Sequence, residues 1–508
     1  MTILYPEEMR TIDQVTISGG RNLLALMERA GCRSVELANQ KWGLPSKAVV
    51  FCGPGNNGGD GMVIARELAM KKIPTWVFFL HGFRKTSQAF IHQLIDIQKL
   101  PISWSFIQTE GAIDDCSGFP DLDFLSSFSS SDWIIDAIYG TGSKKSTSRV
   151  LSHLFLYLNQ LNAKRISIDQ PTGIDGTNGQ LLGKTAFQAD MTICIGYAKT
   201  GLLLYPGRAF VGDLQIADIG FDDQVVLSAI ANPKNWISED DMNKRLPKRI
   251  PWGHKGSFGR VLVTGGSNRY KGAPILAATG AMAVGTGLVF VQTTPPIDQL
   301  MISNYPQWIT IPYHEPVDWT EMDSWVIGMG MMASDETHRL CSQALMNESL
   351  PLVLDAYALE WLSEDPTRGS LLKKRRVPAV LTPHDQEFAQ LIRKDVSYLA
   401  HNRVETGKRF ARENNAILIL KGPTTIIFSP EGSTYWITIG NTGLAKGGSG
   451  DVLSGMVGGF LAQKISPVDA AICGTYLHAR SSDRYSQANW EGSFQPTDIA
   501  SWIGFKNP

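Results

Sequence analysis

The chain has 508 residues, more than one hydrophobic core usually organises, so we expect two domains of roughly 200 to 300 residues each. Its hydrophobic content of 43% and charged content of 19% are typical of a folded globular protein, and its formal net charge is -1. This balance lacks the positive bias that nucleic-acid and anionic-membrane binding require, so both classes of partner are disfavoured.

The six cysteines are scattered without a CxxC spacing, which fits reduced thiols better than a disulfide framework or a zinc site. The N-terminal sequence MTILYPEEMRTIDQ is acidic and polar where a signal peptide is basic and then apolar, and no apolar run reaches the length of a membrane span. We therefore expect a cytoplasmic homo-oligomer that acts on small molecules, with no nucleic-acid or membrane partner.

Two segments share one pattern, in which a β-rich apolar run leads through a glycine-rich turn into a helical pattern. They are AVVFC-GPGNNGGD-GMVIARELAMKK and RVLVT-GGSNRYKGA-PILAATGAMAVG. Other apolar runs (TWVFFL, DWIID, RISID, MTICIG, SWVIGMG, LPLVLD, AVLTP, AILILKG) alternate with helix-compatible stretches, which predicts doubly wound parallel sheets of the α/β class. We place one domain at 1–222, a linker at 223–245 and a second domain at 246–508.

The turn from Gly53 to Gly58 matches GxGxxG and follows a predicted strand, which is typical of dinucleotide-binding folds. About 20 residues further on, where an acidic residue should hold the ribose, the sequence is IPTWVFFLH. A hydride-transferring dehydrogenase is therefore the alternative and not the leading interpretation. Asn56, Asn57 and Asp60 provide fixed polar groups beside glycines, although a turn rich in Asn and Gly accounts for the same letters.

Oxygen donors follow other predicted strands of the same domain. They are Asp136 in DAIYGTG, and Asp169 with Thr172 in DQPTGID. Ligands in open α/β sheets lie beyond the carboxyl ends of strands, so three donors from separate loops can converge on a hard cation. Each Asp can equally be a helix cap or a turn former.

The first half of the chain resembles the YjeF family, the NAD(P)H-hydrate epimerases, through LMERAG, GPGNNGGDG, DAIYGTG, DQPTGIDGTNG and ADMTICIGYAKTGLLLYPGRAFVGDLQIADIG. The resemblance implies a Rossmann-like domain that binds K⁺ through Asn57, Asp136 and Thr172. It also implies that the hydrated nucleotide contacts Asn56, Asn57, Gly58, Gly59, Asp60, Gly140, Thr141, Gly142, Ser143, Lys144, Lys145, Ser146 and Asp169.

Asp169 is our candidate for acid/base catalysis in this domain. Inversion of a carbon that bears a hydroxyl beside a ring nitrogen needs proton transfer and stabilised charge, which a carboxylate near a cation supplies. Lys199, in GYAKTG, also follows a strand, but a lysine in that position is usually a solvated loop residue, and we do not expect it to be catalytic.

In the second half, KGGSGD (Lys446 to Asp451) runs into a helical pattern, which predicts a phosphate cradle at a helix N-terminus. A carboxylate repels phosphate, so Asp451 is expected to accept a proton at the reacting group and not to bind the ligand. The alternative is that Asp451 only complements the helix dipole. The chain contains no GxxxxGK[ST], HExxH or GxSxG motif, so P-loop kinases, zincins and α/β-hydrolases are excluded.

Together with HKGSFGRVLVTGGSNRYKGAPILAA, LVLDAYAL, AVLTPHDQEFAQL, AILILKGPTTIIFSPEG and LHARSSDRYS, this loop resembles the NAD(P)H-hydrate dehydratase half of the same family, which has a ribokinase-like fold. The resemblance implies ADP as co-substrate, with ATP as the alternative, accompanied by Mg²⁺, and catalysis by Asp451. The implied nucleotide contacts are Lys421, Gly422, Pro423, Thr424, Thr425, Gly447, Gly448, Ser449 and Gly450. The implied hydrate contacts are Ala273, Gly330, His384 and Asp451.

Three loops depart from the family pattern in the second half. GPGLG is Gly328-Met-Gly330-Met-Met332, DAD is Asp355-Ala-Tyr357, and HPGE is His384-Asp-Gln-Glu387. Two alternatives to a repair enzyme therefore stay open: a ribokinase-like small-molecule kinase, and a nucleotide-binding protein with impaired dehydratase activity. The first domain favours the repair enzyme, because such kinases do not need it.

Overall fold

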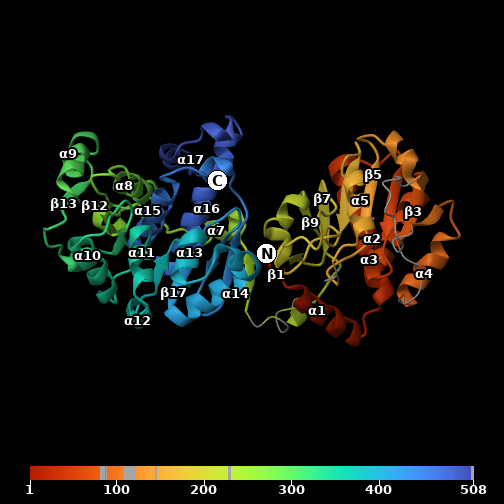
Figure 1. Cartoon of the computed structure of the whole chain (residues 1–508), viewed down its shortest axis with the longest axis horizontal. Coiled ribbons are helices and arrows are strands. Elements are labelled where there is room, and N and C mark those ends of the chain that lie inside the picture. The colour runs from red at the N-terminus through yellow and green to blue at the C-terminus, as the bar shows by residue number, and fades with distance from the viewer. Residues whose placement is uncertain are drawn as a thin grey trace. The chain divides into compact units, whose positions relative to one another are not determined.

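The computed structural model describes residues 1–80, 86, 88–107, 120–142, 146–222, 224–226, 230 and 232–504. The predicted site residues Ser143, Lys144 and Lys145 lie outside the described residues. The chain divides into two compact units, one formed by Thr2–Ala231 and the other by Met1 with Asn232–Pro508. Both units are α/β, as the sequence predicts (Figure 1). No helix in the described part of the chain has the length and apolar character that crossing a membrane requires.

The first unit contains a seven-stranded parallel sheet in the order β4-β3-β2-β5-β6-β7-β9. Its strands are β2 (Ala48–Cys52), β3 (Thr75–Leu80), β4 (Ser103–Ile107), β5 (Trp133–Ala137), β6 (Lys164–Ile168), β7 (Met191–Ile195) and β9 (Asp213–Ala217). The chain moves outward from β2 to β4 and then returns to β5, so the strand order reverses between β2 and β5. Ligands of such sheets bind beyond the strand ends at this reversal point.

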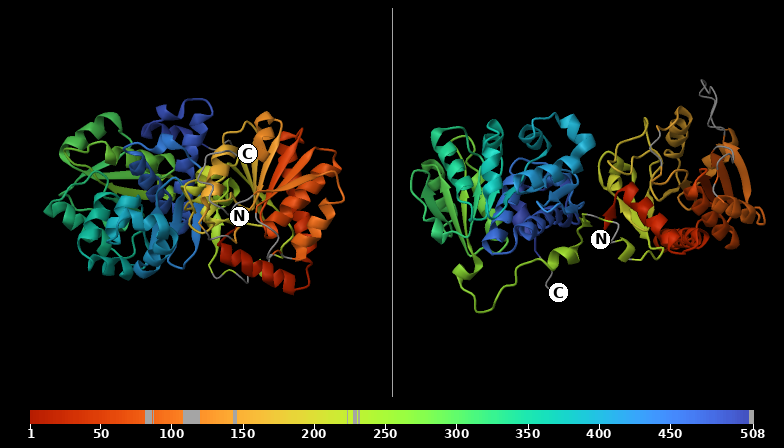
Figure 2. Two further views of the ribbon diagram at one scale, coloured as in Figure 1. Left: turned by 45° about the vertical axis from the view of Figure 1, so that its right-hand side comes forward. Right: turned by 90° about the horizontal axis from the view of Figure 1, so that it is seen from below.

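Both faces of the central strands β2 and β5 are buried, which explains the unbroken apolar runs in the sequence. In β2, Val50 belongs to the core on the side of α2 and α3, whereas Phe51 belongs to the core on the side of α5 (Figure 2). The helices of the unit are α1 (Pro6–Ser18), α2 (Leu23–Trp42), α3 (Asn56–Met70), α4 (Gln88–Ile97) and α5 (Arg149–Leu158). Helix α3 approaches the sheet closely, because a Cβ on Gly61 would lie 2.6 Å from Cβ of Ala137.

A two-stranded parallel sheet joins the start of the chain to the region after β7. Strand β1 (Ile3–Leu4) pairs with β8 (Ala198–Lys199). Helix α1 follows β1 directly, so this pairing fixes α1 near Lys199 although the two are far apart in the sequence.

The second unit contains a ten-stranded sheet in the order β10-β19-β18-β17-β16-β15-β14-β11-β12-β13. Its strands are β10 (Lys234–Trp236), β11 (Arg260–Thr264), β12 (Leu288–Thr293), β13 (Ile309–Pro312), β14 (Ser324–Ile327), β15 (Leu352–Leu354), β16 (Ala379–Leu381), β17 (Ala416–Leu420), β18 (Thr425–Phe428) and β19 (Thr434–Ile437). The sheet is not entirely parallel, because β17, β18 and β19 form antiparallel pairs. The connections 421–424 and 429–433 are too short for the crossover that parallel strands need.

Strand β10 and helix α7 lie within 223–245, the range expected to be a linker. Strand β10 pairs with β19 and extends the second sheet. Its three residues, KNW, are too short and too polar to show a strand pattern in the sequence.

Helices cover both faces of the second sheet, and α8, α15 and α16 contribute to the main apolar core of the unit. The helices are α7 (Glu239–Asn243), α8 (Ala273–Ala283), α9 (Pro295–Asn304), α10 (Asp335–Met346), α11 (Tyr357–Glu364), α12 (Arg368–Lys374), α13 (Asp385–Leu391), α14 (Val396–Asn414), α15 (Ser449–Ala462), α16 (Pro467–Ser486) and α17 (Ile499–Trp502). Helices α8 and α15 come close through glycines, because a Cβ on Gly455 would lie 1.8 Å from the carbonyl oxygen of Ala277.

A buried arginine satisfies the carbonyl groups at the end of α10. Arg375 is 2% exposed, and its guanidinium donates hydrogen bonds to the carbonyl oxygens of Ala344, Leu345, Asn347, Leu350 and Val377. Burial lowers the pKa of Arg375 to about 10, so the side chain stays charged at neutral pH. The carbonyls at a helix end have no partner within the helix, so this side chain replaces their hydration.

We expect Arg375→Met to lower the free energy of unfolding by about 3 kcal/mol, because it leaves several buried carbonyl oxygens without a donor. Urea unfolding followed by circular dichroism measures this change. The control is Arg376→Met, since the Arg376 side chain is 79% exposed. Equal stability of the two variants would show that the Arg375 hydrogen bonds do not stabilise the unit.

Candidate active sites

In the first unit, Asp136 at the end of β5 is completely buried. Its carboxylate accepts hydrogen bonds from Oγ1 and N of Thr172 (2.7 and 2.8 Å), N of Ile138 (3.2 Å) and Oγ of Ser167 (3.2 Å). Burial raises the pKa of Asp136 to about 6, although these hydrogen bonds oppose the shift. A cation bound next to a buried carboxylate of this kind would stabilise its charged form.

Asn57, in the first turn of α3, carries an unsatisfied amide. The residue is 9% exposed, and both Oδ1 and Nδ2 are buried without a hydrogen-bond partner. An unpaired buried polar group costs about 1 to 3 kcal/mol, so such a group in a strand-end loop points to an absent ligand. A Cβ on Gly140 would lie 3.5 Å from Cβ of Asn57 and 2.6 Å from Oδ2 of Asp169, so the loops after β2, β5 and β6 meet here.

Asp169 forms an ion pair with Lys199. The Lys199 side chain is 1% exposed, and its Nζ also donates to the carbonyl oxygen of Ile195 at 3.1 Å. Burial disfavours the charged lysine, but Asp169, Cys194 and Asp13 together outweigh this effect, so the pKa of the Lys199 ammonium is raised. The expectation that Lys199 is a solvated loop residue is wrong, because the pairing of β1 with β8 encloses it.

The backbone of Asp169 is held in an uncommon conformation. Its φ is +67°, in the left-handed region that non-glycine residues rarely adopt. The amide of Thr141 donates to Oδ2 of Asp169 at 2.8 Å, so the carboxylate is fixed from two sides. Strained residues held by their surroundings are common at functional sites.

Two further carboxyl groups face this ion pair. Burial raises the pKa of Asp13, from α1, to about 6, and raises that of Asp60, from α3, well above its usual value; Lys199 and Asp169 act on both. Asp60 was predicted as a nucleotide contact, whereas Asp13 was missed. The sequence MRTIDQ carries no motif around Asp13, and only the β1–β8 pairing brings α1 to this site.

The remaining nucleotide contacts predicted for the first unit lie at the same strand ends. Gly58 is essential to the turn, because a Cβ there would lie 1.9 Å from the carbonyl oxygen of Gly53. Gly59 packs against Met27, and Asn56 begins α3. Gly142 and Ser146, the last predicted contacts that the structure describes in this loop, are exposed.

In the second unit, Asp451 lies in the first turn of α15 beside a lysine and two other carboxylates. Nζ of Lys421 lies 3.4 Å from Oδ1 of Asp355 and 3.9 Å from Oε2 of Glu387. Burial raises the pKa of Asp451 to about 7; Asp355 and Glu387 add to the shift and Lys421 opposes it. Asp451 is therefore partly protonated near neutral pH, which suits a group that exchanges protons.

Asp355 and Ser454 were not among the predicted site residues. The Asp355 side chain is 3% exposed, and its Oδ2 accepts a hydrogen bond from Oγ of Ser454 at 2.7 Å. This bond joins the end of β15 to α15, so Asp355 positions both the helix and Lys421. Ser454 has no motif of its own, and Asp355 enters the sequence analysis only as the first residue of the altered segment Asp355-Ala-Tyr357.

The glycine loop is held firmly at the start of α15. Gly448 has a φ of +96°, and Nε2 of the buried His478 lies 2.9 Å from the carbonyl oxygen of Ser449. Burial lowers the pKa of His478 to about 4, so this histidine is neutral. A Cβ on Gly450 would lie 3.3 Å from Nζ of Lys421, so the structure brings the loop and the lysine together.

The other predicted nucleotide contacts form the turn from β17 to β18. This turn holds Lys421, Gly422, Pro423 and Thr424, and Oγ1 of Thr425 donates to the carbonyl oxygen of Gly422 at 3.2 Å. Lys421 belongs to this turn, and its ammonium also lies next to Gly450 of the glycine loop.

The predicted hydrate contacts lie in different surroundings. Ala273 and Gly330 lie together, because a Cβ on Gly330 would be 2.8 Å from Cβ of Ala273. His384 is 53% exposed and caps α13, with Nδ1 accepting from the amides of Gln386 (3.2 Å) and Glu387 (3.3 Å). It therefore has a structural role, and it also orders the segment that carries Glu387.

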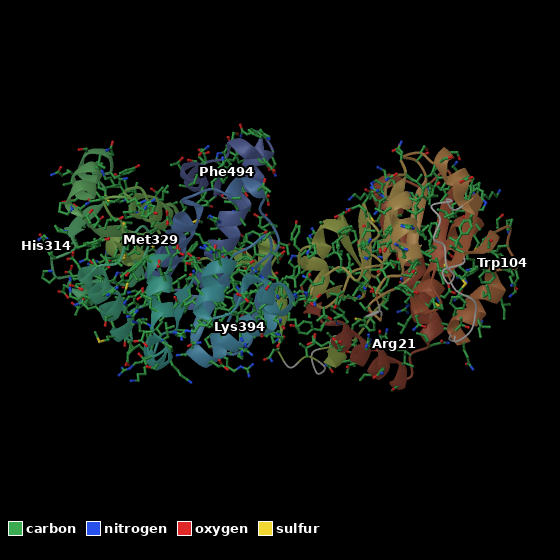
Figure 3. The ribbon with its side chains drawn as sticks, viewed as in Figure 1. Arg21, Trp104, His314, Met329, Lys394 and Phe494 are labelled. Carbon is green, nitrogen blue, oxygen red and sulfur yellow. The ribbon has the colours of Figure 1, made fainter. Side chains whose placement is uncertain are left out.

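Residues of two loops that depart from the family pattern are buried in the unit. Tyr357 is 7% exposed, and its ring is stacked on His338 of α10 with centroids 6.4 Å apart. Met329, labelled in Figure 3, is completely buried after β14. The added volume of Tyr357 thus lies between α10 and α11.

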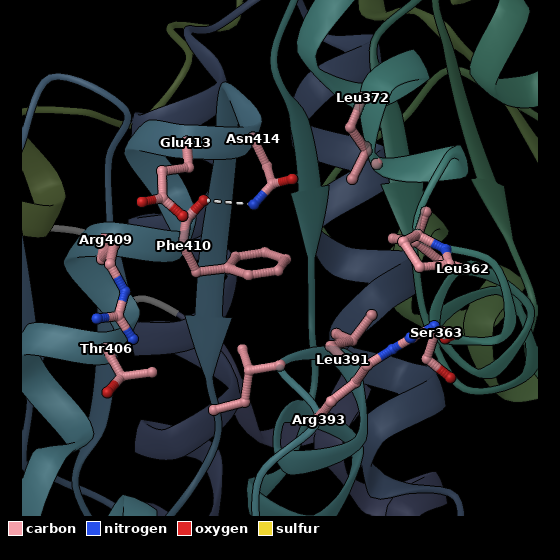
Figure 4. Close-up of a pocket in the computed structure, with 13 residues that line it drawn as sticks. Leu362, Ser363, Leu372, Leu391, Arg393, Thr406, Arg409, Phe410, Glu413 and Asn414 are labelled. Atoms are coloured by element: carbon pink, nitrogen blue, oxygen red, sulfur yellow. Dashed lines mark hydrogen bonds between the residues drawn. The ribbon is translucent and has the colours of Figure 1, made fainter.

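A cavity of about 370 Å³ lies elsewhere in the second unit, between α11, α12, α13 and α14 (Figure 4). Phe410 and Leu391 line it together with Arg393 and Arg409, and none of the predicted site residues does. Among the described residues, no group of three or more His, Cys, Asp or Glu side chains is arranged to hold a metal ion.

Comparison with known proteins finds a matching family for each of the two units. The family described as YjeF-related protein N-terminus matches residues 23–201, and the family described as NAD(P)H-hydrate dehydratase matches residues 261–504. The bifunctional NAD(P)H-hydrate repair enzyme of Moorella thermoacetica is 30% identical over 505 residues, which are 95% of this chain and 92% of that protein. The chain belongs to the family of bifunctional NAD(P)H-hydrate repair enzymes.

The corresponding protein of Coxiella burnetii is also 30% identical, over 98% of each chain. Among solved structures, the ADP/ATP-dependent NAD(P)H-hydrate dehydratase of Bacillus subtilis, co-crystallised with ATP and Mg²⁺, is 27% identical and has a TM-score of 0.48. It covers 53% of this chain, and 96% of its own chain is matched. The two family matches and the full-length similarity to the Moorella and Coxiella proteins confirm the family that the motifs indicate.

Proposed function

We propose that the chain repairs hydrated NADH and NADPH. In this proposal the first unit interconverts the R and S hydrates, and the second converts the S hydrate with ADP into NAD(P)H, AMP and phosphate. Membership of the family supports both activities. The observation that carries the proposal is that each unit holds a carboxylate near a lysine beyond its strand ends. Asp169 is buried and paired with Lys199, and the half-buried Asp451 lies next to Gly450, which Lys421 approaches.

The ion pair in the first unit suits epimerisation. Either the C–O or the C–N bond at the hydrated carbon must open and form again, and both routes need one proton donor and one proton acceptor. Asp169 is the acceptor in our proposal, and the ammonium of Lys199 is the donor. The pair is neutral overall, so it is buried without an uncompensated net charge.

The chemistry of Asn57, Asp136 and Thr172 fits a potassium ion. All three provide oxygen atoms, Asp136 is a desolvated carboxylate, and the amide oxygen of Asn57 lacks a partner. A bound monovalent cation would supply positive charge close to the reacting ring. Asn57, Asp136 and Thr172 would hold the cation.

The second unit suits phosphoryl transfer followed by elimination. Hydroxide is a poor leaving group, so transfer of the β-phosphoryl group of ADP to the ring hydroxyl releases AMP and creates phosphate as a better leaving group. Asp451 accepts the hydroxyl proton, and the amides of Gly447 to Gly450 stabilise the transferring group. The lone pair of the ring nitrogen then expels phosphate, and loss of a proton from the neighbouring carbon restores the double bond.

Mg²⁺ commonly accompanies nucleotide phosphates with only one or two protein carboxylates as ligands. Asp355 and Glu387, both next to Lys421, are the carboxylates that would hold it here. Such a site needs no cluster of three protein ligands. The metal would neutralise phosphate charge while Lys421 orients the same groups.

The cation site predicts a pH-dependent stabilisation by potassium. At pH 7.5 we expect KCl to raise the Tm of the first unit by about 3 °C over choline chloride at equal ionic strength, since a ligand at several times its Kd stabilises by about 1 kcal/mol. At pH 5 the gain should vanish, because Asp136, with a pKa of about 6, is then protonated and neutral. Differential scanning calorimetry measures both values.

Asn57→Ala should abolish this gain at pH 7.5. Asn39→Ala, which changes an exposed asparagine of α2, should preserve it. A potassium-dependent shift that is equal at both pH values, or that survives Asn57→Ala, would contradict the site.

The pKa of Asp451 predicts the pH profile of the dehydratase reaction. A general base works in its deprotonated form, so kcat/KM for ADP-dependent recovery of NADH should fall about tenfold per pH unit below pH 7 and level off above it. Asp451→Asn should lower the rate at pH 8 at least about 100-fold, the usual contribution of a general base.

The matched control is Asp335→Asn, which changes an exposed carboxylate in the first turn of α10 and should leave the rate unchanged. The reaction is followed by the absorbance of reduced nicotinamide. If Asp451→Asn retains the wild-type rate and profile, Asp451 is not the base.

A further inference from the structure

Trp490 combines an exposed ring with a fixed backbone. The residue is 77% exposed, and its carbonyl oxygen accepts hydrogen bonds from N (3.0 Å) and Oγ (2.7 Å) of Ser493. The ring lies over Gly492, because a Cβ on that glycine would be 2.5 Å from Cζ2 of Trp490. The indole is therefore displayed on a rigid turn and does not belong to the apolar core.

The turn that carries Trp490 is fastened to the glycine loop. Nζ of Lys446 donates to the carbonyl oxygens of Gly492, at 2.7 Å, and of Phe494, which is labelled in Figure 3. Oγ1 of Thr442 donates to Oε1 of Glu491 at 2.6 Å. Lys446, the first residue of KGGSGD, thus ties this turn to the glycine loop. Its ammonium already donates to two carbonyl oxygens.

We propose that Trp490 is the stacking surface for the purine base of ADP. This inference rests on the proposed nucleotide site in the second unit. The phosphates are assigned to Gly447–Gly450, and the base of a nucleotide extends beyond its phosphates, so its contact surface must lie beside the glycine loop. An aromatic face on a turn that is already formed binds a base without the cost of ordering the backbone that carries it.

Lys446 connects the phosphate loop to the turn that carries the ring. Because Lys446 donates to the carbonyl oxygen of Gly492, the turn that carries the indole ring is tied to the phosphate loop before the nucleotide arrives. The ring recognises the π-face of the base, whereas the backbone amides recognise the phosphates.

The test compares ADP with inorganic diphosphate, which has the phosphates but no base. Isothermal titration calorimetry on the full-length protein should show that Trp490→Ala weakens ADP binding about tenfold, within the range of single base-stacking contacts, and leaves diphosphate binding unchanged. Trp490→Phe, which keeps an aromatic face, should restore most of the ADP affinity. Trp252→Ala, which removes another tryptophan of this unit that is 81% exposed, should change neither affinity.

Wild-type ADP affinity in Trp490→Ala would overturn the stacking role. An equal loss of ADP and diphosphate affinity would also overturn it, since that result means that the glycine loop itself has changed. If the wild-type protein does not bind ADP at all, the proposed nucleotide site fails together with this inference. Binding by the wild type with no effect of Trp490→Ala removes only the inference.

Discussion

A lysine ammonium placed against buried carboxylates beyond the ends of parallel strands is the interaction on which each site depends. Lys199 pairs with Asp169 in the first unit, and Lys421 pairs with Asp355 in the second. At Asp451, burial raises the pKa of the carboxyl group and Lys421 opposes that shift. The balance leaves Asp451 with a pKa of about 7, so both proton states are accessible.

The sheet topology explains why these groups meet. In the first sheet the strand order reverses between β2 and β5, and the loops after these strands carry Asn57 and Asp136. In the second sheet Asp355 follows β15 and Lys421 follows β17, so both lie at the carboxyl edge, where α15 begins. Glycines permit the close approach of helices and loops, as at Gly455 against α8. The glycines that permit this packing therefore also help to bring the site residues together.

Local patterns in the sequence predicted the α/β class, the apolar strands β2 and β11 with their glycine-rich turns, and the glycine loop with Asp451. They could not predict the burial of Lys199 or the presence of Asp13, because both depend on the pairing of β1 with β8 across nearly 200 residues. Strand β10 is too short to show periodicity. The role of His384 as a helix cap also escaped, since a histidine after a strand fits a ligand contact equally well.

The central claim is that two separate sites act in sequence on hydrated nicotinamide nucleotides. The most direct measurement supplies a mixture of R and S hydrated NADH with ADP and Mg²⁺, and follows recovery of NADH absorbance together with chromatographic separation of the two hydrates. The wild type should recover all of the NADH. Asp169→Asn should recover the S share at the normal rate and then slow sharply, and Asp451→Asn should still equilibrate the hydrates without forming NADH. Equal behaviour of the two variants, or full recovery by Asp451→Asn, would contradict the account.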